Sequence, residues 1–508
     1  MKHMRKLLAA ACVLVLAVQT ALIAGAAGPT YKLTLNNTGA TEHTFDIYQI
    51  FTGDLSVNAG GDKVLANIVW GSGVTPAGQA AIGSASTKAY TLASESDAKD
   101  FAEELVTNNY LTGAVTKVVG AGGSEEITDL APGYYLIKDR DATQSGENSA
   151  YTAFLLKIVG DVTASTKLDV PSVEKKVKDI NDTADDDISD NAWQDSADHD
   201  IGDTIPYQLA GTLPGNYDEY AAYYYRFTDE MSAGLTYQAD ARVFVVNGAS
   251  ETEITGQATI TPAAAAAGAT LTVEITDLKA VTGPTIDKNS KIVVRYTAVL
   301  NNSAVVGSAG NPNTVYLTYS NDPNPGGSGT GTTPKDKAVV FTYQLVINKI
   351  DEGSNPLENA GFTLYKKDST GTWQELKKFT PGTDTTFTFS GLDDGDYKLV
   401  ESDVPEGYNK LDDIEFTITA AHDASAANPT LTSLCGGAEG DTITLSGTQQ
   451  ASVSLLSGAI TASIMNKAGA ILPSTGGIGT KLFYLFGSVL AVGAAVLLVT
   501  KKRMEAED

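Results

Sequence analysis

Short runs in which apolar and polar residues alternate recur along most of the chain. Clear examples are residues 31–35 (YKLTL) and 341–349 (FTYQLVINK). Alternation with a period of two is typical of half-buried β-strands, and the 49 glycines among 508 residues supply turns between them. We therefore expect an all-β chain of immunoglobulin-like β-sandwich domains. One helix is expected in the first domain, at residues 94–111, where apolar residues fall on one helical face.

The two ends of the chain do not follow this pattern. At the start, basic residues precede an apolar run (residues 7–24) and the small residues Ala24-Gly25-Ala26, which predicts a secretory signal peptide over residues 1–27. Near the end, the almost uncharged residues 482–500 are long enough to span a bilayer, and basic residues follow them. This order predicts a transmembrane helix whose short tail, residues 501–508, is cytoplasmic.

Boundaries between the expected domains follow turn-rich and proline-containing stretches. A new strand starts after Leu168-Asp169-Val170-Pro171, and the stretch 321–330 is rich in Asn, Pro and Gly. The predicted organisation is an N-terminal domain (28–167), a middle β-sandwich (168–322), a linker (323–336), a C-terminal β-sandwich (337–467) and a sorting region (468–481).

Charge and cysteine content exclude several classes of protein. The formal net charge of −26 argues against nucleic acid as a partner. Cys12 lies in the expected signal peptide, so Cys435 is left as the one cysteine of the mature chain, and no internal disulfide can form.

Catalytic and metal-binding patterns are also missing from the sequence. The histidines His43, His199 and His422 lie far apart, without the spacing of metal ligands. The acidic stretch 179–203 could hold calcium, but it lacks the glycine and closing glutamate of an EF-hand loop, which favours a solvated loop. No nucleophile elbow or phosphate loop occurs. We therefore predict no enzymatic activity, no cofactor and no metal site.

Three polar residues of the last domain share the inward parity of their strands. Lys349 falls on the face of Leu345 and Ile347, Glu401 on that of Tyr397 and Leu399, and Asn466 on that of the final strand, residues 460–466. A buried amine, carboxyl group and carboxamide are each costly unless they meet. The sequence therefore predicts a cluster of these three groups in the core.

The middle domain repeats this arrangement. Lys175 shares a face with Val173 and Val177, and Asp229 lies in line with Tyr225 and Phe227. In the closing strand, Asn321 has the parity of its apolar residues. Asn313 has the same parity and remains an alternative source of the carboxamide.

The stretch from Tyr397 to Tyr408 (YKLVESDVPEGY) resembles the E-box, YxLxExxxPxGY, of collagen-binding-protein-B-type (CnaB) domains in Gram-positive pilins. The resemblance implies a spontaneous isopeptide bond between Lys349 and Asn466, promoted by Glu401. Burial suits this chemistry, because it lowers the pKa of a lysine and raises that of a carboxylic acid.

The middle domain resembles the isopeptide-forming second domain of backbone pilins, which implies the same roles for Lys175, Asp229 and Asn321. The first domain resembles this pattern only in part. Its residues 135–139 (YLIKD) end in aspartate, and Lys32 is expected to face solvent. No isopeptide bond is therefore expected in the first domain.

Before the apolar span lies the motif Leu472-Pro473-Ser474-Thr475-Gly476, which resembles the sorting signal of Gram-positive surface proteins. The resemblance implies that a sortase cleaves between Thr475 and Gly476. In backbone pilins a lysine of the next subunit then accepts the threonine, usually within a motif ending in Tyr-Pro-Lys. Here residues 162–167 (VTASTK) end in Lys167 without that tyrosine or proline. We predict that Lys167 accepts the threonine of the neighbouring subunit. The alternative acceptors are Lys157, Lys176 and Lys178.

Together these resemblances imply a shaft subunit of a covalent pilus on the Gram-positive cell wall. Its implied partners are a sortase, other copies of the chain, minor pilins and peptidoglycan. The alternatives are a monomeric wall-anchored adhesin, a tip or base pilin, and a wall-anchored hydrolase, for which no catalytic constellation is visible.

Overall fold

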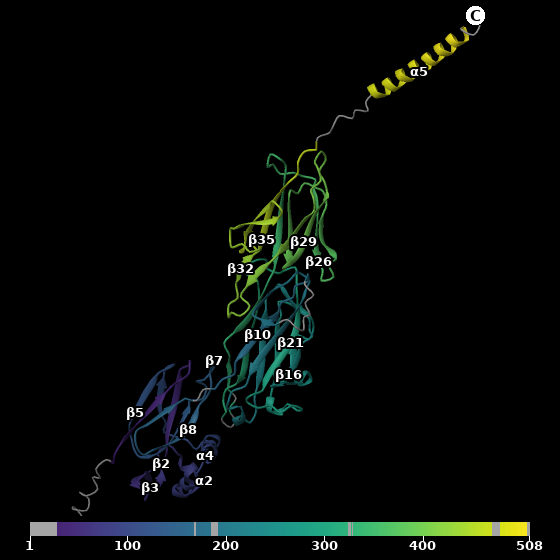
Figure 1. Cartoon of the computed structure of the whole chain (residues 1–508). Helices are drawn as coiled ribbons and strands as arrows, with labels where there is room; N and C mark the ends of the chain where they lie inside the picture. Colours follow the sequence, from purple (N-terminus) through teal and green to yellow (C-terminus); the bar gives the residue numbers. More distant parts are fainter. Residues whose placement is uncertain are drawn as a thin grey trace, which may run out of the picture.

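The computed structural model describes residues 28–166, 169–183, 192–323, 327, 329–469 and 478–504. Three β domains follow one another along an elongated molecule, and the helix α5 (Ile478–Met504) stands apart at one end (Figure 1). The predicted all-β class, with tandem sandwich domains before an apolar helix, is confirmed.

The first domain contains two sheets around a small apolar core. The smaller sheet has the order β5 (Ser124–Leu130), β1 (Tyr31–Asn36), β9 (Val162–Ser165). The larger sheet has the order β3 (Lys63–Trp70), β2 (His43–Val57), β6 (Gly133–Asp139), β8 (Ala153–Ile158), and β4 (Val115–Val119) pairs with β2. Leu33, Leu35, Phe45 and Ile137 are buried between the two sheets, as the alternating pattern of β1 predicts.

Three helices extend the first domain: α2 (Pro76–Ile82), α3 (Ala85–Thr91) and α4 (Glu95–Thr107). The predicted helix is α4. It begins after Ser94, whose side chain accepts a hydrogen bond from the Asp97 backbone while Asp97 caps Ser94 in return. Phe101 and Leu105 pack on the larger sheet. The helices α2 and α3 were not predicted, because seven residues are too few to display a clear helical period.

The middle domain is a sandwich of two eight-stranded sheets. The first sheet has the order β11 (Trp193–Gln194), β10 (Val173–Lys178), β13 (Thr204–Thr212), β21 (Lys291–Leu300), β15 (Leu235–Tyr237), β19 (Ala266–Ala267), and β16 (Arg242–Asn247) joins β21 to β17 (Ser250–Glu253). The second has the order β12 (Ser196–Asp198), β24 (Asp336–Phe341), β22 (Asn311–Ser320), β14 (Tyr225–Met231), β20 (Thr270–Ile275), β18 (Thr259–Thr261). Short 3-10 turns lie at Tyr217–Glu219, Thr255–Gln257 and Leu278–Ala280. Tyrosines dominate the space between the sheets, among them Tyr207, Tyr225, Tyr237 and Tyr319.

The stretch expected to be a linker belongs to the middle domain instead. β23 (Thr330–Thr332) pairs antiparallel with the end of β22, and β24 pairs antiparallel with the beginning of β22. The residues rich in Asn, Pro and Gly therefore connect two neighbouring strands of one sheet, not two domains. The first domain also contributes β7 (Gly146–Glu147), which pairs with β23 at the junction of the two domains (Figure 1).

The last domain packs a five-stranded sheet on a four-stranded one. The orders are β28 (Thr386–Leu392), β25 (Tyr343–Ile350), β35 (Ala459–Met465), β34 (Gln449–Ser454), β33 (Thr442–Ser446), and β27 (Trp373–Phe379), β26 (Gly361–Lys367), β29 (Gly395–Asp403), β30 (Ile414–Ile418). A ribbon of β31 (Ala420–His422) and β32 (Leu431–Leu434) completes the domain. The domain's first strand, β25, and its last, β35, run parallel side by side, with Lys349 opposite Ile464.

Candidate crosslinking sites

The middle domain holds a buried lysine against a buried aspartate. Lys175 on β10 and Asp229 on β14 belong to opposite sheets, and both side chains are fully inaccessible to solvent. Lys175 Nζ lies 2.7 Å from Asp229 Oδ1 and donates to the Tyr296 hydroxyl at 2.8 Å. Tyr296 in turn donates to Asp229 Oδ2. The predicted pairing of Lys175 with Asp229 is therefore present, with a tyrosine added to it.

Burial shifts the proton equilibria of this set toward neutral groups. Desolvation lowers the pKa of Lys175 and raises that of Asp229, although each partner favours the charged form of the other. Desolvation also raises the pKa of Tyr296 well above its usual range, so the hydroxyl keeps its proton. A neutral amine beside a neutral carboxylic acid is the form that suits nucleophilic attack on an amide.

The carboxamide next to this set is that of Asn313. Its Nδ2 donates to the Tyr296 hydroxyl at 2.7 Å, so Asn313 and Lys175 share one hydroxyl oxygen. Asn313 is completely buried, and its Oδ1 has no hydrogen-bond partner among the described residues. An unpaired buried carbonyl oxygen is costly. The Oδ1 of Asn321 is likewise without a partner in the described part of the chain, so the contact with the Tyr296 hydroxyl is what distinguishes Asn313.

Asn321, the residue expected to supply the carboxamide, lies elsewhere. Asp229 pairs with Val315 on β22, and Asn321 follows six residues later, about 20 Å along an extended strand. The Asn321 side chain donates to Gln144 O at 3.3 Å and to Ser149 Oγ at 3.0 Å, both in the first domain. Strand parity correctly predicted that Asn321 is buried. It does not determine which residue of β22 lies opposite Lys175. Asn321 joins two domains, and Asn313, the alternative, is the amide beside Lys175.

The role of Tyr296 was not predicted, although the sequence contains a signal for it. Ile292, Val294 and Tyr296 alternate along β21, which places the tyrosine on the buried face. Both Tyr207 and Tyr296 also present a ring to the Lys175 ammonium, at 4.9 and 5.3 Å from the ring centroids. The two tyrosine rings thus form walls of the site, and the Tyr296 hydroxyl connects Lys175 with Asp229.

In the last domain Glu401 and Asn466 are in direct contact, and Lys349 lies near Glu401. Lys349 at the end of β25, Glu401 on β29 and Asn466 directly after β35 are each at most 2 % exposed. Asn466 Nδ2 donates to Glu401 Oε1 at 2.7 Å, and Glu401 Oε2 accepts from the backbone of Leu411 at 3.0 Å. Lys349 Nζ donates to the carbonyl oxygens of Ile464, at 3.1 Å, and Ile350, at 3.3 Å.

The Lys349 amine is prepared to lose its proton. Burial lowers its pKa to about 8, and the nearby Glu401 only partly opposes this effect. The parallel pairing of β25 with β35 brings the backbone of Asn466 next to that of Lys349. The Asn466 backbone donates to the carbonyl of Ile350, the residue after Lys349, at 3.0 Å. Asn466 Oδ1 is buried without a partner among the described residues, as in the middle domain.

The first domain has a different buried pair. His43 Nδ1 lies 2.8 Å from Asp139 Oδ1, with both side chains inaccessible, and Asp139 Oδ2 accepts from the Thr152 backbone. Burial raises the pKa of Asp139. Lys32 instead faces solvent and pairs with Glu126 at 2.6 Å. Asp139 of the partial E-box thus meets a histidine, and no lysine–asparagine pair accompanies it in the described part of this domain.

The residues proposed for sorting lie outside the described residues: Leu472, Pro473, Ser474, Thr475, Gly476 and Lys167. Thr166, the residue before Lys167, is buried, and its hydroxyl and carbonyl oxygens accept hydrogen bonds from Thr38. Among the alternatives, Lys157 is exposed, Lys176 pairs with Asp195 at 2.5 Å, and Lys178 is buried.

Three family models match successive parts of the chain. Residues 201–323 match a Gram-positive pilin backbone subunit 2, Cna-B-like domain. Residues 343–430 match the SpaA prealbumin-like fold domain, and residues 464–506 match the LPXTG cell wall anchor motif. The fold and these matches define a cell-wall-anchored surface protein built of Cna-B-like domains.

Individual relatives narrow this class. The chain is 28% identical over 269 residues to the trypsin-resistant surface T6 protein of Streptococcus pyogenes serotype M6, an alignment that covers 41% of this chain and 48% of the relative. The chain thus spans about half the length of that curated relative. The solved T6 backbone pilin of the same serotype superposes with a TM-score of 0.56 at 18% identity, over 88% of this chain and all of that one. The full-length major pilin SpaD of Corynebacterium diphtheriae gives a TM-score of 0.45 at 17% identity, over 87% and 98%. The chain is therefore similar to Gram-positive backbone pilins in its middle domain and in its anchor motif.

Proposed function

We propose that this chain is the structural shaft subunit of a sortase-assembled pilus, with an internal isopeptide bond in each of its last two domains. The observation that carries the proposal is the pair of buried amine–acid–amide sets, Lys175–Asp229–Asn313 and Lys349–Glu401–Asn466. Structural function rather than enzymatic turnover follows, because each set reacts once and is consumed.

The reaction balances without an added reagent. The neutral lysine Nζ attacks Cγ of the asparagine, the C–N bond of the carboxamide breaks, and ammonia leaves with the proton that the amine gives up. In the middle domain Asp229, together with Tyr296, holds and returns the proton and polarises the amide. In the last domain Glu401 has this role. Water is kept out by burial, so the new amide is not hydrolysed.

The positions of the bonds suit a protein under tension. In the last domain Lys349 lies on the first strand, and Asn466 directly follows the last one, beside it. A covalent bond between them carries a pulling force past the domain, because the hydrogen bonds between its strands no longer lie in the load path. In the middle domain a bond between Lys175 on the opening strand and Asn313 on β22 takes the strands between these two residues out of the load path.

Polymerisation joins the C-terminal end of one subunit to the first domain of the next. A sortase would cleave after Thr475 and transfer the threonine carbonyl to Lys167 of another copy, and the final subunit would be transferred to peptidoglycan. The support is the anchor-motif match at residues 464–506 together with the helix α5 of sufficient length to hold the chain in the membrane before sorting. The assembled fibre, rather than the single subunit, then supports adhesion of the cell.

Wall-released material from cells that express the chain tests this function. After boiling in detergent, an immunoblot should show a ladder of covalent multimers. Lys167→Arg should reduce the ladder to anchored monomer, whereas Lys157→Arg, the matched control, should leave it intact. A single monomer band from the unaltered chain would refute polymerisation and favour a monomeric wall-anchored adhesin.

A further inference from the structure

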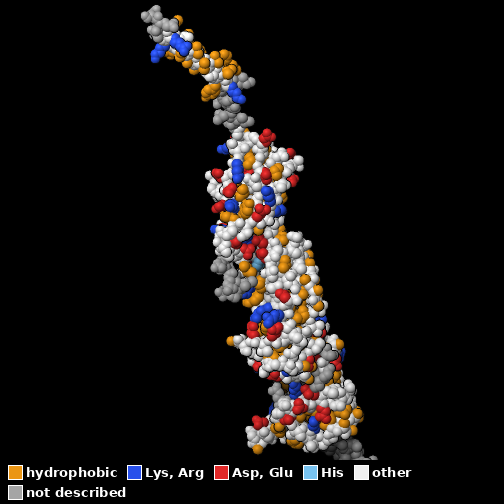
Figure 2. All heavy atoms as spheres, turned by 90° about the vertical axis from the view of Figure 1, so that its right-hand side faces the viewer, with side chains coloured by type: hydrophobic (Ala, Val, Ile, Leu, Met, Phe, Trp, Pro, Cys, Tyr) orange, Lys and Arg blue, Asp and Glu red, His pale blue; other side chains and the backbone are white. Residues whose placement is uncertain are grey.

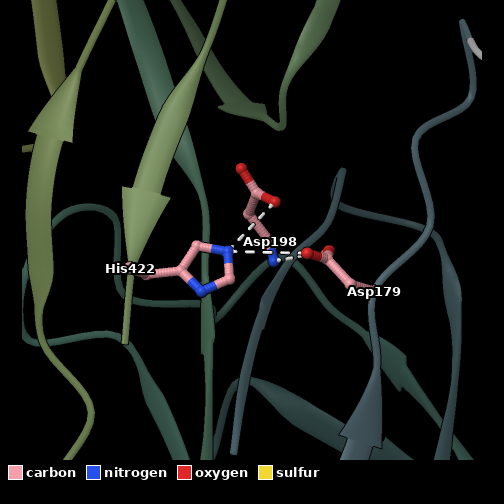
Figure 3. Close-up of side chains that lie close together, drawn as sticks. All are labelled: Asp179, Asp198 and His422. Carbon is pink, nitrogen blue, oxygen red and sulfur yellow. Dashed lines mark hydrogen bonds and ion pairs between the residues drawn. The ribbon is translucent and has the colours of Figure 1, made fainter. Parts of the chain in front are cut away.

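The middle and last domains meet at a seam where three potential metal ligands converge. Asp179 follows β10, Asp198 ends β12, and His422 ends β31 of the last domain. Figure 3 shows the imidazole of His422 directed at the two carboxylates. More than 200 positions of sequence separate His422 from the aspartates, so no spacing motif reveals the site.

The distances between these groups are those of ligands around a shared ion. His422 Nε2 lies 3.5 Å from Asp179 Oδ2 and 3.6 Å from Asp198 Oδ1. Both distances are too long for good hydrogen bonds. Ligands at about 2.1 Å from a tetrahedral zinc ion lie about 3.4 Å apart, so the observed separations leave room for such an ion.

The other ring nitrogen of His422 is held as in known metal sites. Nδ1 lies 2.8 Å from Ser196 Oγ, and Ser196 uses its own proton to bond the Asp423 carbonyl at 2.7 Å. The serine oxygen therefore accepts the Nδ1 proton, which turns Nε2 toward the carboxylates. Fixing the tautomer through the second nitrogen is what outer-shell partners of metal-binding histidines do.

An unpaired carboxylate oxygen in the same place is available to a cation. Asp198 is 3 % exposed, and its Oδ2 has no hydrogen-bond partner among the described residues. Acidic side chains gather where the last domain meets the middle one (Figure 2). Lys366 already serves the neighbouring group, with Nζ 2.6 Å from Asp200 and in contact with Asp393. That group has its cation, whereas Oδ2 of Asp179 and Oδ1 of Asp198 both lie beside the His422 imidazole.

We propose that Asp179, Asp198 and His422 form a site for a divalent transition metal of the zinc type, which ties the middle domain to the last. An imidazole nitrogen with two carboxylates favours zinc over calcium, because calcium takes oxygen ligands almost exclusively. The ion would add a non-covalent bridge between two domains that each contain their own crosslink. This proposal differs from the sequence-based prediction, which was that the chain has no metal site.

Zinc titration of the three-domain chain, residues 28–471, after treatment with EDTA tests the site. We expect saturable binding of one zinc ion per chain, and a cobalt-substituted form with visible absorption bands. His422→Gln and Asp198→Asn should each weaken zinc binding at least about 10-fold. The exposed Asp413→Asn, the matched control, should bind zinc as the unaltered chain does.

Three results would overturn the proposal: no saturable binding at micromolar zinc, one-to-one binding that survives in both ligand variants, or a site that takes calcium in preference to zinc. Circular dichroism and intact mass should accompany the titration, so that a variant that fails to fold is recognised. Asp179→Asn provides a third ligand variant, on the partly exposed side of the site.

Discussion

Replacing Asn313 by alanine separates the two candidate amides of the middle domain. The side chain of Asn313 shares the Tyr296 hydroxyl with Lys175, whereas that of Asn321 contacts the first domain. Asn313→Ala should therefore remove one of two internal crosslinks, and Asn321→Ala should remove none. Each Lys–Asn bond releases one ammonia, so each lowers the intact mass by about 17 Da.

The stability lost with this bond can be worked out from the length of the loop it closes. A crosslink between positions 175 and 313 closes a loop of about 140 residues, which by the chain-entropy estimate stabilises the folded state by about 5 kcal/mol. For a domain of about 170 residues this corresponds to a fall of roughly 15 °C in the unfolding midpoint. The free Lys175 amine left in the core adds to the loss, because burial disfavours its charged form.

Intact mass and scanning calorimetry of residues 28–471 measure both effects. We expect a deficit of two ammonias in the unaltered chain and in Asn321→Ala, and of one in Asn313→Ala, with the lower midpoint in Asn313→Ala. The Asn321 variant should instead loosen the junction of the first two domains. If Asn321→Ala lost an ammonia deficit while Asn313→Ala kept both, the placement of the middle crosslink would be refuted.

Three further predictions concern the proton chemistry of the two sites. Glu401→Gln should keep the fold but block the crosslink of the last domain, which restores about 17 Da of mass; a bond that forms at the normal rate would exclude Glu401 as its promoter. Tyr296→Phe should slow bond formation in the middle domain by about 100-fold or more, seen as a mixed population by mass soon after refolding, with Tyr237→Phe as its control. In Asn466→Ala the free Lys349 has a folded pKa of about 8 against an ordinary value of 10.5. Between those pH values the unfolded chain binds a proton that the folded chain does not, so stability should rise with pH from 8 to 10.5. Denaturant unfolding across this range checks the slope, and a flat profile in the variant would show that Lys349 is not perturbed.

Local alternation was enough to predict the class of fold and most of the buried polar residues. Parity along single strands placed Lys175, Asp229, Lys349, Glu401 and Asn466 in the core, and all five are buried there. Parity repeats every two residues, however, and so it could not distinguish Asn313 from Asn321. That choice depends on the register of β22 against β14, which the turns and the packing of the whole sandwich determine.

Features formed between domains were beyond the reach of such reasoning. The predicted linker, residues 323–336, contains β23, and the predicted last domain contains nearly all of β24, yet both strands pair with β22 in the middle sandwich. The convergence of His422 with Asp179 and Asp198 depends on how two domains dock, which no local pattern encodes. The E-box lies on one strand and its following turn, so local sequence was sufficient to predict the burial of Glu401.

The joint between subunits is the most direct test of a covalent shaft. Wall-released polymer should be digested with trypsin and searched by tandem mass spectrometry for branched peptides that end in Thr475. The account predicts a branch in which the Thr475 carbonyl is joined to Nζ of Lys167. If Thr475 were found only on cell-wall peptide, and never on a lysine of another copy, the chain would be a singly anchored protein and the shaft function would be contradicted.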